Sequence, residues 1–187
     1  KNQGRGIACG FWFNIGGQTC TDINIGVDGT VNLTLGTVDV GGSRASMSMI
    51  AAEELGIPYE QVKANIADTG SLGHNDMTEG SRGTFSSGMA TIFAAREAIG
   101  VLKQRAAAMW GIPVEDVAWE KGQAIAVGKT HNNLPPLSLQ EIASKSGRTG
   151  GPIAGHNEVV ADGAGMGFAA HICDVEVDKE TGRSSTV

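Results

Sequence analysis

The sequence predicts an α+β fold, with a mixed and mainly antiparallel sheet and two principal helices. Alternating apolar strands fill the first forty residues, two later segments carry apolar residues at helical spacing, and a helix–Gly-Ile-Pro–strand unit occurs twice. With 187 residues the chain can bury a sizeable core. We expect one domain over residues 1–187, with a division into two lobes at about 1–146 and 147–187 as the alternative.

The first forty residues have the apolar pattern of strands. Residues 6–15 form an apolar run typical of a buried strand, whereas residues 19–27 and 30–40 alternate between apolar and polar side chains. The Asp28-Gly29 pair between the two alternating segments is a strong β-hairpin signal. We therefore expect the three segments to form an antiparallel meander that ends at Gly41.

Two helices are predicted, at residues 43–55 and about 87–110, the second with Phe93 and Leu102 facing inward. Both stop at Gly-Ile-Pro, as expected from a glycine at the C′ position followed by a proline. The segments AAEELGIPYEQV and AAAMWGIPVEDV match in register, and this indicates an internal pseudo-repeat of helix, Gly-Ile-Pro and strand. Two unrelated helix stops are the alternative.

The remaining elements are shorter. A strand is expected at about 62–67 after the first helix. Beyond the second helix we expect a strand at 124–127, a helix at 137–146 with Ser138 near its N-cap, a flexible connection at 147–155, and strands at 157–161 and 167–177.

Composition excludes several function classes. The net charge of -6 argues against a general nucleic-acid or anionic-membrane surface, and no apolar run has the ~20 residues of a membrane span. Three distant cysteines without a CxxC pair favour a reducing compartment, so we expect the cytoplasm, with the periplasm as the alternative. The start at Lys1 and the strand pattern running to Val187 suggest a piece of a longer chain.

The segment DTGSLGHNDMTEGSRGTFSSG, residues 68–88, is predicted to be a binding loop. Its glycines and hydroxyl residues lead into the second helix, with Ser86 or Ser87 as the expected N-cap. A similar junction, Gly41-Gly42-Ser43-Arg44, precedes the first helix. Helix amino ends attract anions, so we expect both junctions to converge on one polyanionic ligand.

The charged residues near these junctions allow more than one interpretation. Arg82, between small residues, has room to form paired hydrogen bonds with a phosphate or carboxylate, and an ion pair with Glu79 or Asp76 is the alternative. Arg44 opposes the dipole of the first helix, so either a ligand or an acidic partner is needed to explain it.

Catalytic and metal-binding patterns are missing from the sequence. There is no GxSxG, HExxH, EF-hand or Walker A motif, and loop carboxylates such as Asp68, Asp76 and Glu79 usually cap turns or meet water. No catalytic residue is therefore nominated. The histidines lack metal-ligand spacing, so no metal site is predicted from His74, His131, His156 and His171.

Taken in order, these motifs resemble the molybdopterin-binding part of the large subunit of the xanthine dehydrogenase and aldehyde oxidase family, the molybdenum hydroxylases. The resemblance covers nearly all of the chain. It is carried by Asp39-Val40-Gly41-Gly42-Ser43, Leu55-Gly56-Ile57-Pro58, Gly80-Ser81-Arg82-Gly83-Thr84-Phe85, and Asp174-Val175-Glu176-Val177-Asp178 with Thr181-Gly182.

This resemblance implies that the pterin and its phosphates lie between the two junctions. Gly42 stands where the family turn usually offers a glutamine, so one expected contact is missing. The family's catalytic glutamate and its glycine-rich segment beside the metal are not among these residues, so the chain alone is expected to be inactive. The implied cofactor-binding residues are Gly41, Gly42, Ser43, Gly80, Ser81, Arg82, Gly83 and Thr84.

The resemblance further implies a molybdenum cofactor, as molybdopterin or its cytosine dinucleotide form, in an oxidoreductase that hydroxylates an aldehyde or an N-heterocycle. Iron–sulfur clusters and FAD are expected on other domains or subunits, and the rest of the large subunit is the expected partner. Two alternatives stay open. One is a non-catalytic scaffold domain of the same fold, which Gly42 supports, and the other is a simple phosphate- or nucleotide-binding module at the same loop.

Overall fold

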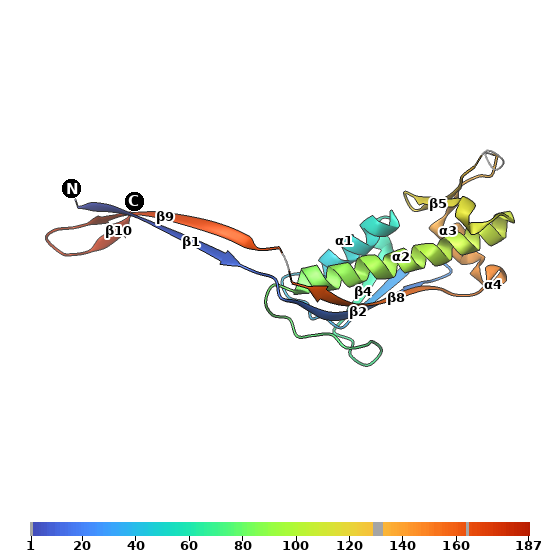
Figure 1. The fold of residues 1–187 in the computed structure, drawn as a ribbon, viewed down its shortest axis with the longest axis horizontal. Helices are drawn as coiled ribbons and strands as arrows, with labels where there is room; N and C mark the ends of the chain where they lie inside the picture. The colour runs from blue at the N-terminus through green and yellow to red at the C-terminus, as the bar shows by residue number, and fades with distance from the viewer. Residues whose placement is uncertain (1, 129–132, 164) are drawn as a thin grey trace.

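The computed structural model describes residues 2–128, 133–163 and 165–187. A body of helices and sheets carries a long ribbon that projects from one end and holds both chain termini (Figure 1). The elements in chain order are β1 Gln3–Trp12, β2 Gly16–Ile25, β3 Val31–Leu35, α1 Ser43–Leu55, the 3₁₀ helix η1 Tyr59–Gln61, β4 Val62–Ile66, α2 Gly83–Trp110, the 3₁₀ helix η2 Val114–Asp116, β5 Val117–Glu120, β6 Gln123–Ala126, β7 Leu137–Ser138, α3 Leu139–Ser144, α4 Ser146–Thr149, β8 Ile153–Asp162, β9 Gly167–Val177 and β10 Ser184–Thr186.

The central sheet has the strand order β4-β3-β2-β8. β2 pairs antiparallel with β3 and with β8, whereas β3 and β4 are parallel because α1 connects them. The predicted hairpin turn is confirmed, since Gly29 has a φ of 84° and the Asp28 carboxylate accepts the N–H of Thr30 at 3.0 Å. The predicted α+β class with mainly antiparallel pairing is therefore confirmed.

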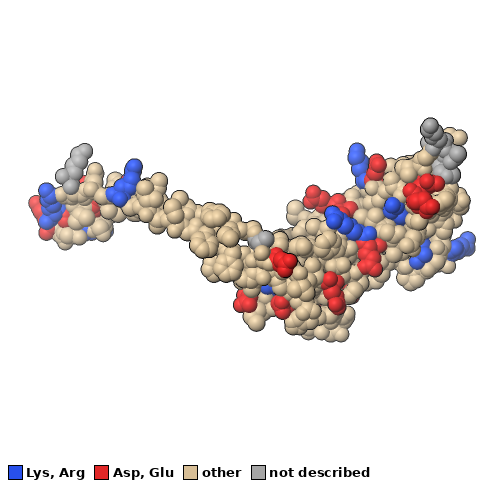
Figure 2. All heavy atoms as spheres, in the orientation of Figure 1, with Lys and Arg blue, Asp and Glu red and all other residues tan. Residues whose placement is uncertain are grey.

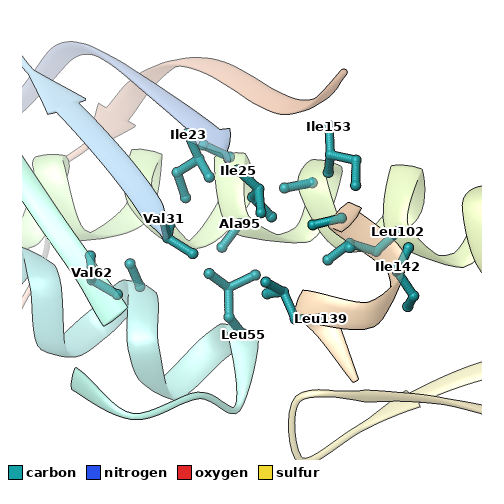
Figure 3. Packing of buried hydrophobic residues seen from close by; sticks show 14 of the residues in the cluster. Ile23, Ile25, Val31, Leu55, Val62, Ala95, Leu102, Leu139, Ile142 and Ile153 are labelled. Carbon is teal, nitrogen blue, oxygen red and sulfur yellow. The ribbon is translucent and has the colours of Figure 1, made fainter. Parts of the chain in front are cut away.

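Helices α1 and α2 cover one face of this sheet. The core lies between the helices and the sheet (Figure 3). Every second side chain of β2 and β3 points into the core, as the strand period requires. Full burial of one such side chain stabilises the fold by roughly 1.5–3 kcal/mol. The fully buried aliphatic side chains on these two strands are Ile23, Val31, Leu33 and Leu35.

The buried face of α2 consists mainly of alanines, which corrects the predicted inward position of Phe93. Leu102 is fully buried as expected, but the Phe93 side chain is 36% exposed. The reason is the close approach of β8, because a Cβ added to Gly155 would lie 2.0 Å from the Ala94 carbonyl oxygen. Only small side chains fit between elements this close. The completely buried alanines of α2 are Ala90, Ala94, Ala95, Ala98 and Ala106.

The internal repeat is confirmed at the level of local structure. α1 and α2 each end at a left-handed glycine, Gly56 with a φ of 72° and Gly111 with a φ of 69°. Each copy continues through Ile-Pro into a 3₁₀ helix and a strand. The two strands enter different sheets, because β4 pairs with β3 and β5 pairs with β6. The Trp119 indole N–H joins the copies by donating to the Leu55 carbonyl at 2.9 Å.

The predicted antiparallel meander is wrong in its first strand. β1 pairs with β9 along the projecting ribbon, and β8 takes the place beside β2. All ten residues of β1 are exposed, including Phe11 and Trp12, so β1 is not a buried strand in this chain. The apolar run indicates a strand, but it does not say which partner the strand packs against. β3 also ends at Leu35 and not at residue 40.

Two further boundaries differ from the predictions. α2 begins at Gly83, four residues before the expected start, and β8 begins at Ile153, inside the segment expected to be flexible. The predicted N-cap of α3 is confirmed, because Ser138 and Glu141 form a capping box. The division into two lobes stays a prediction. Among the described helices, none combines the length and apolar character needed to cross a membrane.

Candidate functional site

The two principal helices run parallel, so their amino ends lie at the same end of the body, where the ribbon leaves it (Figure 1). Thr91, in the third turn of α2, contacts the Met47 sulfur in the second turn of α1 through its hydroxyl, at 3.9 Å. Farther along, the Arg96 Nε donates to the Glu54 carboxylate at 2.6 Å. Both helices therefore run in the same direction, and the two predicted junctions lie at the same end of the body.

The α1 junction is an open turn of small residues. Gly41 and Gly42 have φ values of 61° and 82°, and nothing lies within 4 Å of the position that a Cβ would take on either. The Asp39 carboxylate accepts the main-chain N–H of Arg44 at 3.0 Å and pairs with its side chain at 3.6 Å. An acidic partner therefore explains Arg44, and it uses one donor of this helix end.

The α2 junction has more main-chain N–H groups that form no hydrogen bond. The prediction of Ser86 or Ser87 as N-cap is wrong, since both are buried within the helix and Arg82 holds the N-cap position. Across the part of the chain that the structure describes, no hydrogen bond uses the N–H groups of Gly83, Thr84 or Phe85. These three donors and the positive end of a long helix favour an anionic ligand.

Arg82 has its donors occupied by the protein itself. Its side chain is only 2% exposed. The guanidinium can donate five hydrogen bonds and forms five, at 2.5–3.2 Å. It therefore clamps the loop onto β2 and has no donor left for a ligand. The acceptors are the carbonyls of Gly16, Gln18, Asp76 and Met77 and the hydroxyl of Thr19.

The loop before α2 is also tied to the root of the ribbon. The Gly80 carbonyl accepts the N–H of Ile15 at 3.2 Å, and the Ser81 carbonyl accepts the Asn14 amide at 3.1 Å. Ser81 has a φ of 59°, a left-handed conformation that is strained for a residue with a side chain and that often marks a functional loop. Asn14 and Ile15 give no sequence signal, since their role depends on this contact between distant segments.

The carboxylates of the loop support turns and neighbouring strands. Asp68 accepts the N–H of Gly70 at 3.0 Å and the hydroxyl of Ser71 at 2.7 Å, so it caps a turn as expected. The main-chain N–H of Gln18 donates to Asp76 at 2.6 Å and lowers the pKa of that carboxyl, with further lowering by the His74 hydrogen bond and the Arg82 charge. Neither geometry is that of a catalytic base.

The eight residues predicted from the sequence lie in different environments at the starts of the two helices. Arg82 is buried, Ser43, Gly80 and Gly83 are partly buried, and the exposed residues are Gly41, Gly42, Ser81 and Thr84. The histidines do not join this group, apart from His74 on the loop. His131 lies outside the described residues.

Comparison with known proteins identifies the family. A family model described as a molybdopterin cofactor-binding domain matches residues 1–187. The carbon monoxide dehydrogenase large chain of Afipia carboxidovorans is 27% identical over 173 residues, which is 88% of this chain and 21% of that protein. The corresponding large chain of Hydrogenophaga pseudoflava is 33% identical over 100 residues, which is 53% of this chain and 12% of that protein.

A solved structure shows the same fold. The reconstituted CO dehydrogenase from Oligotropha carboxidovorans matches with a TM-score of 0.83 and 24% identity, covering 98% of this chain and 25% of that chain. The chain therefore spans a quarter or less of the length of these proteins. Because the family model matches the chain from end to end, the resemblance seen in the sequence is confirmed, and the protein belongs to the molybdopterin cofactor-binding domain family.

Proposed function

We propose that this chain holds the molybdenum cofactor of a larger oxidoreductase at the neighbouring amino ends of α1 and α2. One observation carries the proposal. Two parallel helices begin at the same end of the body, each after a turn of small residues, and the first N–H groups of α2 form no hydrogen bond within the described part of the chain. Such donors suit the phosphates of a pterin cofactor.

The residues at this end of the body fit a polyanionic group. Open space beside Gly41 and Gly42 lets a ligand approach the main chain closely, and the donors of Gly83 and Thr84 face outward from the start of α2. Fixed main-chain dipoles bind an anion without reorganising. The proposed site residues are Gly41, Gly42, Ser43, Gly80, Ser81, Arg82, Gly83 and Thr84. Arg82 takes part by holding the loop in place, because its main-chain N–H donates to the Glu79 carbonyl at 3.0 Å and its side-chain donors are occupied.

This arrangement separates the role of the chain from that of the cofactor. When bound, the molybdenum centre supplies the two-electron oxidation chemistry, and the chain supplies binding and orientation. Arg82 and Ser86 act as positioning residues, because both bond to the carbonyl of Gly16 and so hold the loop and the start of α2 in place. We propose no catalytic carboxylate within this chain.

We propose that the rest of a large subunit covers the ribbon. Figure 2 shows charged side chains at the ribbon tip and over the body, with a shaft between them that carries none on the visible face. Large apolar side chains of β1 and β9 are exposed on this shaft, Phe168 to 79%. Exposed apolar surface of this extent marks an interaction site, and the chain matches only part of the length of its relatives.

The wider enzyme is proposed from the family. Its iron–sulfur clusters and FAD lie on other domains or subunits, and the cofactor is molybdopterin or its cytosine dinucleotide form. A small aldehyde or an N-heterocycle is the proposed substrate, and the carbon monoxide dehydrogenases among the relatives add carbon monoxide as a candidate. We place the enzyme in the cytoplasm, with the periplasm as the alternative.

A scaffold domain that has lost the cofactor is the second candidate, and Gly42 favours it. The glutamine expected at this turn is replaced by a residue with no side chain, and nothing fills the space beside it. A glutamine side chain contributes hydrogen bonds that the main chain of Gly42 cannot replace. The absence of molybdenum from the native full-length protein would support the scaffold.

A negative charge added at the start of α2 tests the main proposal. Gly83→Asp and Gly83→Asn differ only in charge, and a Cβ at this position meets nothing closer than 3.8 Å. Aspartate in the first helical turn stabilises a helix but repels phosphate. In the complete large subunit, Gly83→Asp should lower molybdenum and pterin content about tenfold or more below Gly83→Asn, the equivalent of ~1.4 kcal/mol. Equal content in the two variants contradicts the proposal.

A further inference from the structure

A group of metal-ligating side chains lies on the face of the central sheet opposite the core. β2 and β8 are antiparallel neighbours, with Cys20 opposite Glu158 and Asp22 opposite His156. Side chains alternate between the faces of a strand, so these four lie together on the face away from Ile23. The two residues on β2 are separated in the sequence from the two on β8 by more than 130 residues. The spacing of the histidines therefore could not predict this group.

The ligand atoms are close enough to share one ion. Those of Cys20, His156 and Glu158 lie within 4.8 Å of one another. The Cys20 sulfur is 4.0 Å from His156 Nε2, which is 3.8 Å from a Glu158 carboxylate oxygen. Around a tetrahedral Zn²⁺ such separations are about 3.4–3.6 Å. These two must therefore shorten by about 0.4 Å, and the third, between the Cys20 sulfur and the Glu158 carboxylate, lies within 4.8 Å and must shorten by up to about 1.2 Å. The exposed His156 and Glu158 side chains can make these movements.

We propose that Cys20, His156 and Glu158 form a binding site for a divalent transition metal ion, with Zn²⁺ the best match. Thiolate, imidazole and carboxylate are the three ligand types that Zn²⁺ takes in proteins. The thiolate and the carboxylate together neutralise a dication. With three protein ligands, a fourth position remains for water.

Asp22 prepares His156 for this role. Its carboxylate forms a hydrogen bond with His156 Nδ1, which leaves Nε2, the nitrogen next to Glu158, available to an ion. The Cys20 sulfur lies 4.0 Å from both ring nitrogens. Metal-binding histidines are commonly oriented in this way, by a carboxylate on the other ring nitrogen. The His156 main chain is held as well, since its N–H donates to the Glu97 carboxylate at 3.1 Å.

Gly73 lies against the Cys20 and Glu158 side chains, and its lack of a side chain keeps the space beside them open. A Cβ at this position would lie 2.7 Å from a Glu158 carboxylate oxygen and 3.3 Å from the Cys20 sulfur, so any larger residue would fill the site. Burial raises the pKa of the Cys20 thiol, the N–H of Gly73 lowers it, and the Asp22 and Glu158 charges raise it. A bound cation replaces the thiol proton.

Zn²⁺ and Co²⁺ titrations of the full chain, purified without added metal, test the proposal. We expect equimolar binding, with a sulfur-to-cobalt charge-transfer band that is lost in Cys20→Ser. The matched controls Cys9→Ser and Cys173→Ser change exposed cysteines on the ribbon and should keep the band. Asp22→Asn should weaken binding roughly 10- to 100-fold. Gly73→Ala should weaken it without removing a ligand.

A second measurement does not depend on whether the variants fold. X-ray absorption at the zinc edge of the unmodified, zinc-loaded chain should show one sulfur neighbour at about 2.3 Å and nitrogen or oxygen neighbours at about 2.0–2.2 Å. A zinc shell without sulfur, no equimolar binding at micromolar Zn²⁺, or a cobalt band that survives in correctly folded Cys20→Ser would each overturn the proposal. The cofactor proposal is unaffected by any of these results.

Discussion

The Nε atom of Arg82 lies 2.5 Å from the carbonyl oxygen of Gly16, a residue 66 positions earlier in the chain. The same carbonyl accepts the Ser86 hydroxyl at 2.9 Å. One acceptor at the start of β2 therefore holds the loop and the first turn of α2. The proposed cofactor site depends on this contact, because it holds the start of α2 and with it the free N–H groups.

Arg82→Lys should destabilise the fold by about 3 kcal/mol or more. A lysine has three donors for the five acceptors that Arg82 serves, so buried carbonyls lose their partners, and each such loss costs about 1–3 kcal/mol. Urea unfolding measures the change. Arg96→Lys is the matched control, since the ion pair of Arg96 with Glu54 is exposed and should be worth about 0.5 kcal/mol or less. Similar losses in both variants would contradict the clamp.

Gly155→Ala should destabilise the fold by about 3 kcal/mol or more, since the new Cβ would overlap the main chain of α2 at Ala94. Gly100→Ala is the contrasting variant within α2. Nothing lies within 4 Å of its added methyl group, and alanine is the better helix former, so the fold should gain about 0.5–1 kcal/mol. Thermal unfolding compares the two, and a Gly155→Ala protein as stable as the parent would refute the close packing of β8 on α2.

Asp76→Asn should make stability less dependent on pH in acid. The folded pKa of Asp76 is lowered, so its contribution is present above the unfolded pKa of about 3.9 and is lost as pH falls through the folded pKa. Asparagine can still accept the N–H of Gln18 but does not titrate. Denaturant unfolding at pH 7 and at about pH 3 should show a smaller difference for Asp76→Asn than for the parent. Glu60→Gln, an exposed carboxylate on η1, controls for net charge.

Phe168→Lys should reduce self-association of the isolated chain. Phe168 lies opposite Phe11 on the ribbon, and the two expose 79% and 65% of their surfaces. Uncovered apolar surface drives association, and a lysine on a strand edge or face opposes it. Sedimentation velocity measures the change. Phe93→Lys is the control, because it changes an exposed phenylalanine on α2, away from the ribbon, and should leave association unchanged. Equal effects from both variants would argue against the ribbon as the docking surface.

The sequence predicted the local structure best where one residue determines the backbone. Gly56 and Gly111 end their helices as expected, because a left-handed turn is accessible to glycine at little cost. The β2–β3 hairpin follows equally from Asp28-Gly29. Such features depend on a few neighbouring residues, so a single sequence contains the information for them.

Pairing between distant segments could not be predicted in the same way. β1 has the pattern of a strand, but nothing within Gln3–Trp12 indicates that β9 is its partner. The role of Arg82 was open for the same reason, since its acceptors come from β2 and from the loop. Cys20 and His156 meet only through the register of β2 with β8. Each depends on long-range geometry that composition and periodicity do not encode.

The most direct test is a crystal structure of the cofactor-loaded protein that contains this chain. We expect phosphate oxygens of the pterin to lie about 2.7–3.2 Å from the main-chain nitrogens at Gly83 or Thr84, with Gly41 and Gly42 on the other side of the ligand. The Arg82 guanidinium should remain bonded to Gly16 beneath the loop. A cofactor whose phosphates contact neither helix end would contradict the proposal that the amino ends of α1 and α2 hold it.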